Sequence, residues 1–333
     1  MQQPLQSLYA TTPTQTPAST ASIRPTHKPM KLHLFLKRPE WLALLLGLVF
    51  GACNLILTPP FQAPDEDNRF FRSYHVADGN FLGEKTNQRV GGTIPVSLVE
   101  TAERFRHLRA RPHSKTTAQE IKAAFEVELM PANEAFYDFP NSAIYPPVLF
   151  APQALAIFLF KPFHLSPLAL LYVARVASLL FWLCALVFAI RIIPFQRELL
   201  LLLGLLPMST FMHASCSADV VPDALGFLSI AVVFRAIYRT SKLQKWELLS
   251  LGGFAIALAS AKLVYVPVFL LLAFVPAARF GSGMRKWTTL GALGGIALGA
   301  IASWSLLMND LYTPYSEYNP RSKTSYHSWP APT

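Results

Sequence analysis

Long apolar runs separated by short basic segments dominate the second half of this chain. After position 147 the sequence is almost continuously apolar, and several runs exceed the roughly 18 uncharged residues that mark a bilayer span. Residues 61–147 differ, because they are polar and hold about twelve of the nineteen acidic residues. The pattern predicts an all-α polytopic membrane protein with a long external loop after its first transmembrane helix.

The first 58 residues predict a tail followed by a membrane helix. Residues 1–36 are rich in Thr, Pro, Ser and Gln, and they contain no acidic residue. Such a segment cannot bury enough apolar surface to offset its ordering entropy, so we expect a disordered, basic tail. The apolar run at 41–58 follows Lys37 and Arg38 and lacks a small-residue cleavage pattern, so it is expected to be a retained first transmembrane helix.

The distribution of basic residues predicts the topology. Lysine and arginine favour the cytoplasmic ends of membrane helices, which places the N-terminus in the cytoplasm and the loop at 59–147 outside. The apolar segment Val148–Phe160 is short for a span, so residues 148–161 are expected to form an interfacial helix. The bundle at 168–308 then keeps every short basic loop inside and gives about seven spans. The segment 309–333 is expected to be an external, disordered tail.

Composition narrows the functional classes. The chain is 52% hydrophobic and only 14% charged, against about 25% charged in a soluble domain. The net charge of +10 is explained by the topology, so we expect membrane lipids and no nucleic acid as partners. The three cysteines have no paired spacing, so they predict neither a disulfide framework nor a metal site.

Three adjacent acidic residues follow the first helix. Asp65, Glu66 and Asp67 lie within a few residues of the expected membrane surface. Adjacent carboxylates repel one another, and the resulting rise in pKa suits a general base. The same oxygen atoms could hold a divalent cation, although no cofactor is predicted with certainty. A solvated acidic turn remains the structural alternative.

Four further residues in apolar surroundings are candidates for substrate contacts. Asp219 and Asp223 are spaced to share one helix face, and an ionisable group in an apolar run usually lines a cavity or pathway. Both could instead favour a helix N-terminus. Lys262 lies on the external side against the charge bias and suits a lipid phosphate, with snorkelling as the alternative. Arg175 suits either a phosphate or a structural ion pair with a loop carboxylate.

The predicted topology brings four separated polar segments to the external face. They lie at residues 64–69, 141–147, 213–223 and 260–262. We therefore expect Asp65 or Glu66 to approach Asp219 and Lys262 across one outward-facing cavity.

The motifs in these segments resemble a bacterial membrane protein family, domain of unknown function 2142. The resemblance covers about residues 40–320. It is carried by TPPFQAPDE at 58–66, FFRSY at 70–74, ADG at 77–79, YPP at 145–147, PQA at 152–154, SCSAD at 215–219 and AKLVY at 261–265.

This family is similar to type-C glycosyltransferases, which use sugars linked to polyprenyl phosphate. The resemblance implies a type-C-like fold in a bacterial inner membrane, with Asp65 or Glu66 as the catalytic carboxylate. The YPP segment matches a juxtamembrane helix of that fold. Substrate and phosphate contacts are expected from Arg69, Arg72, Tyr145, Arg175, Asp219, Asp223, Lys262 and Tyr265.

The implied activity is transfer of a sugar from a polyprenyl-phosphate lipid to a glycan acceptor on the cell surface. Family members usually continue for several more spans beyond the position of Asn319, so this chain resembles a truncated member. Two other classes stay open: a transporter or polysaccharide-export component with Asp219 and Asp223 in its pathway, and an inactive membrane scaffold. Acids gathered at the rim of the bundle would favour transfer, and acids along the bilayer would favour transport.

Overall fold

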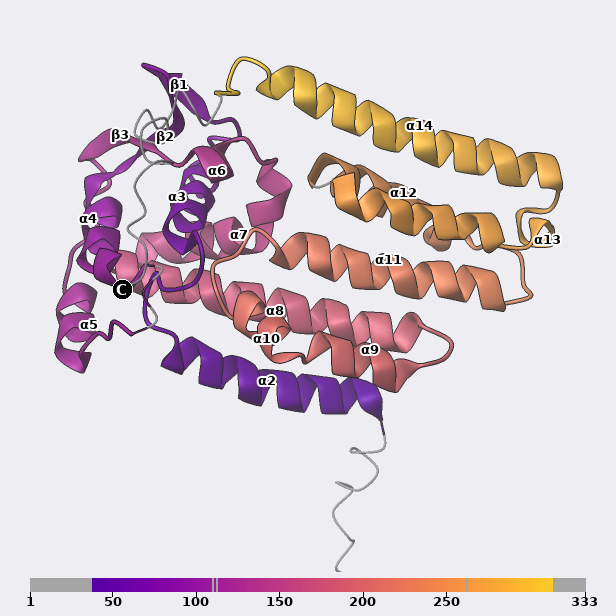
Figure 1. The fold of residues 1–333 in the computed structure, drawn as a ribbon, viewed down its shortest axis with the longest axis horizontal. Coiled ribbons are helices and arrows are strands. Elements are labelled where there is room, and N and C mark those ends of the chain that lie inside the picture. Colours follow the sequence, from indigo (N-terminus) through magenta and orange to yellow (C-terminus); the bar gives the residue numbers. More distant parts are fainter. Residues whose placement is uncertain (1–37, 110, 112, 262, 314–333) are drawn as a thin grey trace, which may run out of the picture.

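The computed structural model describes residues 38–109, 111, 113–261 and 263–313, which form a helix bundle with a mixed head at one end (Figure 1). The expected tail at 1–36, Lys262 and the segment 314–333 lie outside these residues. The bundle consists of α2 (Pro39–Leu57), α8 (Pro167–Ile192), α9 (Arg197–Gly204), α10 (Pro207–His213), α11 (Val220–Tyr238), α12 (Lys245–Ala261), the 3-10 helix η4 (Leu263–Phe274), α13 (Ala277–Phe280) and α14 (Gly283–Met308).

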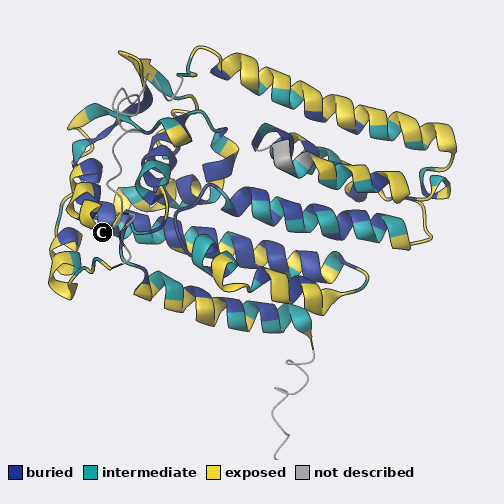
Figure 2. Cartoon of the chain, viewed as in Figure 1, coloured by how far each residue is buried: buried dark blue, intermediate teal, exposed yellow. Residues whose placement is uncertain are grey.

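Four of the described helices are long and apolar enough to cross a membrane: α2, α8, α11 and α14. In the most apolar stretch of α8 and of α11 56% is buried, against 17% in α2 and 11% in α14. Figure 2 shows this difference as largely yellow and teal surfaces on the two outer helices. The exposed side chains on α2 and α14 include many leucines, which is the surface that lipid tails require.

Of the about seven predicted spans, four correspond to these helices, which could cross a membrane by their length and composition. The segment Leu199–Met212 is divided into α9 and α10, and Pro207 begins the second helix without a backbone N–H to donate. Helix α12 has 17 residues, or about 26 Å, which is shorter than the roughly 30 Å apolar core of a bilayer. The apolar segment at 263–278, which was also expected to span, forms the 3-10 helix η4, which has 12 residues and contains Pro267.

The head spans residues 59–166 and is not all-α, so the predicted fold class is wrong in this detail. Its elements are α3 (Glu66–Ala77), β1 (Glu84–Thr86), β2 (Arg89–Pro95), α4 (Val96–Arg104), η1 (Arg106–Leu108), α5 (Ala118–Phe125), β3 (Glu134–Asp138), α6 (Pro140–Ala143), η2 (Pro147–Phe150), α7 (Ala151–Phe160) and η3 (Lys161–Phe163). The three strands form an antiparallel sheet in the order β1-β2-β3.

Two glycines let this sheet form against its neighbours. A Cβ atom on Gly91 would lie 1.8 Å from the carbonyl oxygen of Tyr137, and one on Gly92 would lie 2.4 Å from Nε2 of His75. The missing side chains therefore permit β2 to approach both β3 and α3. The same glycines interrupt the alternation of apolar and polar residues, which is why the sequence pattern did not predict the strand.

The short apolar helix α7 begins and ends at the head. It packs against α3 and α8, and Lys161 directly after it forms an ion pair with Asp78, which follows α3. Its two ends therefore lie close to the same domain. The interfacial position expected for residues 148–161 stays a prediction.

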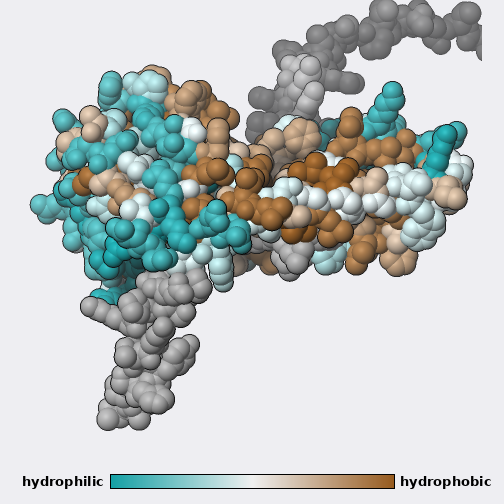
Figure 3. Space-filling view, turned by 90° about the horizontal axis from the view of Figure 1, so that it is seen from above, coloured by the Kyte–Doolittle hydropathy of each residue, from teal (hydrophilic) through white to brown (hydrophobic). Residues whose placement is uncertain are grey.

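Charge is divided between the two ends of the molecule. The head carries the hydrophilic surface, whereas the sides of the bundle are largely hydrophobic (Figure 3). At the other end, Arg235 and Arg279 both bind the buried carboxylate of Glu247, at 3.1 and 3.4 Å. The basic connections from α8 to α9, from α11 to α12 and from α13 to α14 lie at this end (Figure 1).

Candidate functional site

The three carboxylates of the acidic motif turn in three directions at the start of α3. Glu66 points into the interior, Asp67 faces a cavity in the head, and Asp65 is exposed at the helix N-terminus. They therefore do not form a single oxygen cage for a cation. Among the described residues, no three Asp, Glu, His or Cys side chains lie close enough to hold a metal ion.

Glu66 forms a fully buried ion pair with Arg175 of α8. Both side chains are 0% exposed, and the guanidinium donates to the two carboxylate oxygens at 2.8 and 2.6 Å. Arg175 also donates to the carbonyls of Thr58 and Pro59, at 3.0 and 2.9 Å. Of the two roles left open for Arg175, the structure shows the ion pair. The bridge fixes the link between α2 and α3 to the bundle.

The same carboxylate holds the turn between α10 and α11. The backbone N–H of Cys216 donates to Oε1 of Glu66 at 2.9 Å. Burial, and then the negative charge of Glu66, raise the pKa of the Cys216 thiol to about 12. The thiol is therefore protonated and chemically inert at neutral pH.

Asp65 has a left-handed backbone conformation, with φ 53°, and its side chain is exposed. Positive φ is uncommon outside glycine, and such strain persists only where surrounding structure imposes it. The buried neighbour Glu66 provides that constraint. Of the two carboxylates predicted to be catalytic, Asp65 is the one open to a substrate.

Arg69 connects α3 to the turn before α11. Its guanidinium donates to Oγ of Ser217 at 3.1 Å and to Asp219 at 3.4 Å. Its backbone N–H donates to the carbonyl of Asp65 at 3.0 Å, so the two residues are one helical turn apart. The structure thus brings together the acidic motif and the predicted 213–223 segment, which are about 150 positions apart in the sequence.

Asp223 lies one turn further into α11 and contacts two polar side chains of the described residues. Nε2 of His213 is 3.1 Å from Oδ2, and the hydroxyl of Tyr265 donates to Oδ1 at 2.6 Å. The His213 ring stacks on Trp182, with 3.9 Å between the ring centroids. Sequence reasoning named Tyr265 only through its motif and gave His213 and Trp182 no role.

A largely apolar hollow of about 360 Å³ opens beside this group, and its wall includes Asp223 and His213. The remaining lining residues are Trp182, Leu203, Leu206, Met208, Ser209, Met212 and Phe227. Leu203, Leu206 and Met208 are among the exposed large hydrophobic residues on the bundle surface. The hollow therefore has apolar walls and a polar inner end.

Tyr145 and Arg72 lie in different surroundings. Tyr145 packs against the cluster that contains Ala218, Val221 and Ala261, so the YPP segment also joins this end of the bundle. Arg72 is buried inside the head, where it donates to the carbonyls of Asn80 and Phe81 at 3.1 and 2.6 Å. Burial lowers its pKa to about 10. Lys262 lies outside the described residues.

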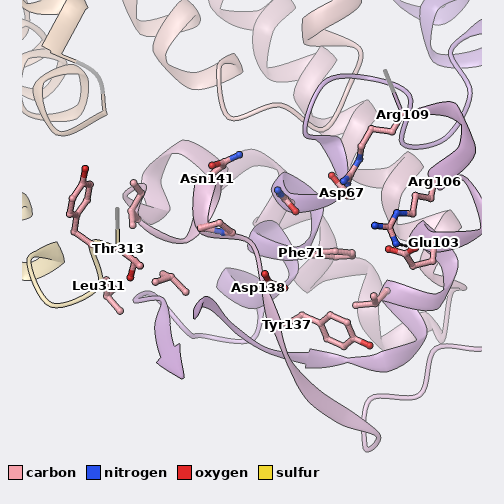
Figure 4. Close-up of a pocket in the computed structure, with 16 residues that line it drawn as sticks. Asp67, Phe71, Glu103, Arg106, Arg109, Tyr137, Asp138, Asn141, Leu311 and Thr313 are labelled. Carbon is pink, nitrogen blue, oxygen red and sulfur yellow. Dashed lines mark hydrogen bonds and ion pairs between the residues drawn. The ribbon is translucent and has the colours of Figure 1, made fainter. Parts of the chain in front are cut away.

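A cavity in the head was not predicted from the sequence. It has a volume of about 630 Å³ and lies between α3, α4, the sheet and the segment after α14 (Figure 4). Asp67 forms an ion pair with Arg109 at its edge, and Arg106 binds Glu103 at 3.0 Å. Tyr137, Asp138 and Asn141 were the available signal, but their significance depends on residues distant in sequence.

Comparison with protein families identifies residues 48–326 as a predicted membrane protein of the family DUF2142. This match covers most of the chain, so the protein belongs to that family. No curated protein and no solved structure matches the chain.

Proposed function

As a member of this family of membrane proteins, the chain is, we propose, a glycosyltransferase that acts at the external face of a bacterial inner membrane. It would move a sugar from a polyprenyl-phosphate donor to a hydroxyl group of a cell-surface glycan. The observation that carries this proposal is the position of Asp65, an exposed carboxylate one helical turn from Arg69 at the end of the bundle. The resemblance to type-C glycosyltransferases supports the same assignment.

The proposed chemistry uses Asp65 as the general base. Its carboxylate removes the proton of the acceptor hydroxyl, and the hydroxyl oxygen attacks C1 of the donor sugar. The bond between C1 and the phosphate oxygen breaks, and its electron pair leaves with the polyprenyl phosphate. Because attack and departure take place on opposite faces, the configuration at C1 inverts.

Arg69 is the described cation best placed to stabilise the leaving phosphate. Its side chain is 16% exposed, and it donates to the buried hydroxyl of Ser217 and to the carboxylate of Asp219, which is 21% exposed. A guanidinium aimed at developing negative charge lowers the barrier most where water is limited. The hollow beside Asp223 begins one turn from Asp219 and offers apolar walls for the start of a polyprenyl chain.

A transporter is the second candidate, because His213, Asp223 and Tyr265 form a chain of hydrogen-bonded polar groups. In the described residues this chain stops at the head end of α11. The next carboxylate along the bundle, Glu247, is buried at the opposite end and bound by two arginines. Acids confined to the rim favour transfer over transport.

The test is a transfer assay with the purified chain in liposomes. Labelled polyprenyl-phosphate sugars are supplied as donors, and release of polyprenyl phosphate is measured. Asp65→Asn should lower the rate by about 100-fold or more, as expected for loss of a general base. Asparagine tolerates positive φ better than most residues, so the backbone should be retained.

The matched control is Asp310→Asn, which neutralises another exposed aspartate beyond the end of α14 and should leave the rate unchanged. Full turnover by Asp65→Asn would assign the base to another residue. Failure of the unaltered protein to consume any of the donors would overturn the proposed function.

A further inference from the structure

The head cavity lies on a different flank of α3 from Arg69. Asp67, Asn68 and Phe71 line it, and Phe71 shares one side of the helix with the other two because it lies four and three positions after them. At about 630 Å³ the cavity falls within the range of small-molecule sites, which is roughly 300–1,000 Å³. Nothing in the proposed transfer step uses it.

The charges around this cavity argue against an anionic ligand. Its two arginines each have a carboxylate partner, since Arg109 pairs with Asp67 and Arg106 with Glu103. Asp138 adds a third carboxylate to the lining. A phosphate would therefore have to compete with a carboxylate for each arginine, whereas a neutral ligand would disturb neither ion pair.

The remaining polar groups suit hydroxyls. Among the described residues, the side-chain amides of Asn68 and Asn141 make no hydrogen bond, and Oγ1 of Thr313 is buried without a partner. An amide offers both donors and an acceptor, as does each hydroxyl of a sugar. A buried oxygen without a partner is costly, so a ligand that supplies one would be stabilised.

Aromatic side chains complete the lining. Phe71, Tyr137 and Tyr312 all border the cavity, and Figure 4 shows Phe71 and Tyr137 between the charged edge and the sheet. Aromatic rings pack well against apolar faces while leaving the edges of a ligand free for hydrogen bonds. This lining therefore suits a ligand that has apolar C–H faces to pack against the aromatic rings. Hydroxyl groups around its edge would bind the amides, and its lack of charge would leave the ion pairs intact.

We propose that this cavity binds a neutral sugar residue of the acceptor glycan. The assignment of that sugar to the acceptor rests on the proposed function, whereas binding of the sugar itself does not. The ligand would be held by Asn68, Asn141 and Thr313 and would pack against Tyr312.

The test measures sugar binding to the full chain in lipid nanodiscs, because maltoside detergents would compete. Saturation-transfer NMR is recorded with methyl glucoside, methyl mannoside and N-acetylglucosamine. At least one sugar should bind, and inorganic phosphate should not displace it. Asn141→Ala and Tyr312→Ala should each raise its dissociation constant by about tenfold or more.

Matched controls come from similar exposed residues away from the cavity. Asn133→Ala changes another exposed asparagine of the head, and Tyr238→Ala changes a tyrosine that is 61% exposed, against 67% for Tyr312. Both should bind the sugar within about twofold of the unaltered protein. Equal weakening in the controls, or no binding at millimolar sugar, would overturn the inference.

A further variant separates this inference from the proposed function. Asp65→Asn should bind the sugar as the unaltered protein does, because Asp65 does not line the cavity. If no donor is consumed but Asn141→Ala still weakens sugar binding by about tenfold or more, the cavity assignment stands and the transfer proposal falls. If transfer proceeds while no sugar binds, the cavity assignment falls alone.

Discussion

Replacing Glu66 with glutamine should destabilise the fold by about 3–5 kcal/mol, which is typical when one partner of a buried ion pair is removed. Glu66 accepts two hydrogen bonds from Arg175 and one from the backbone of Cys216. Glutamine keeps the shape but turns an NH₂ group toward these donors. Arg175, which is 0% exposed, would keep two backbone carbonyls and lose its counter-charge.

The measurement is reversible unfolding of the purified protein in mixed micelles, with Glu103→Gln as the matched control. Glu103 also pairs with an arginine at 3.0 Å, but its side chain is 54% exposed, so its loss should cost about 0–1 kcal/mol. The double variant of Glu66→Gln and Arg175→Gln should lose less stability than the sum of the two single variants. If Glu66→Gln costs no more than Glu103→Gln, the ion pair does not hold the fold in this way.

Three further outcomes can be measured. A cysteine at Gln88, in the turn between β1 and β2, should react with an impermeant maleimide added outside cells, whereas one at Lys242 should not; the reverse pattern would contradict the topology. Burial and the charge of Arg72 lower the pKa of His75, so the unfolded state takes up a proton first as pH falls. Stability should therefore decrease below about pH 6.5, and His75→Gln should flatten this slope; an unchanged slope would refute the assignment. Cys216 should resist alkylation until the protein unfolds, and rapid labelling of the native state would show that it is not buried.

The arrangement of polar segments could be predicted because it depends on topology rather than on side-chain geometry. Basic residues between apolar runs assign each connection to one end of a bundle. That reasoning placed the acidic motif and the 213–223 segment together, and Arg69 indeed contacts Ser217 and Asp219. The sequence also raised pairing with a loop carboxylate as one role for Arg175, and Glu66 is that partner.

The sequence alone could not distinguish the functions of the three carboxylates in the acidic motif. Asp65, Glu66 and Asp67 are adjacent and chemically alike, so only the direction of each side chain on α3 distinguishes them. The sheet was missed for a related reason, because β2 depends on Gly91 and Gly92 being close to β3 and α3. The head cavity combines residues from five segments, and no local pattern reports such a combination.

The first turn of α3 links three parts of the molecule, and this explains why its backbone is strained at Asp65. Glu66 must point inward to reach Arg175, while Asp67 must face the cavity to pair with Arg109. Adjacent residues of a helix point about 100° apart, so both constraints together fix the orientation of α3. Arg69 is then directed toward the bundle. The segment between α2 and α3 is held by Arg175, and the positive φ of Asp65 joins this segment to α3. A substitution that frees Glu66 should therefore release Asp65 as well, which couples the stability of the head to the geometry of the proposed catalytic carboxylate.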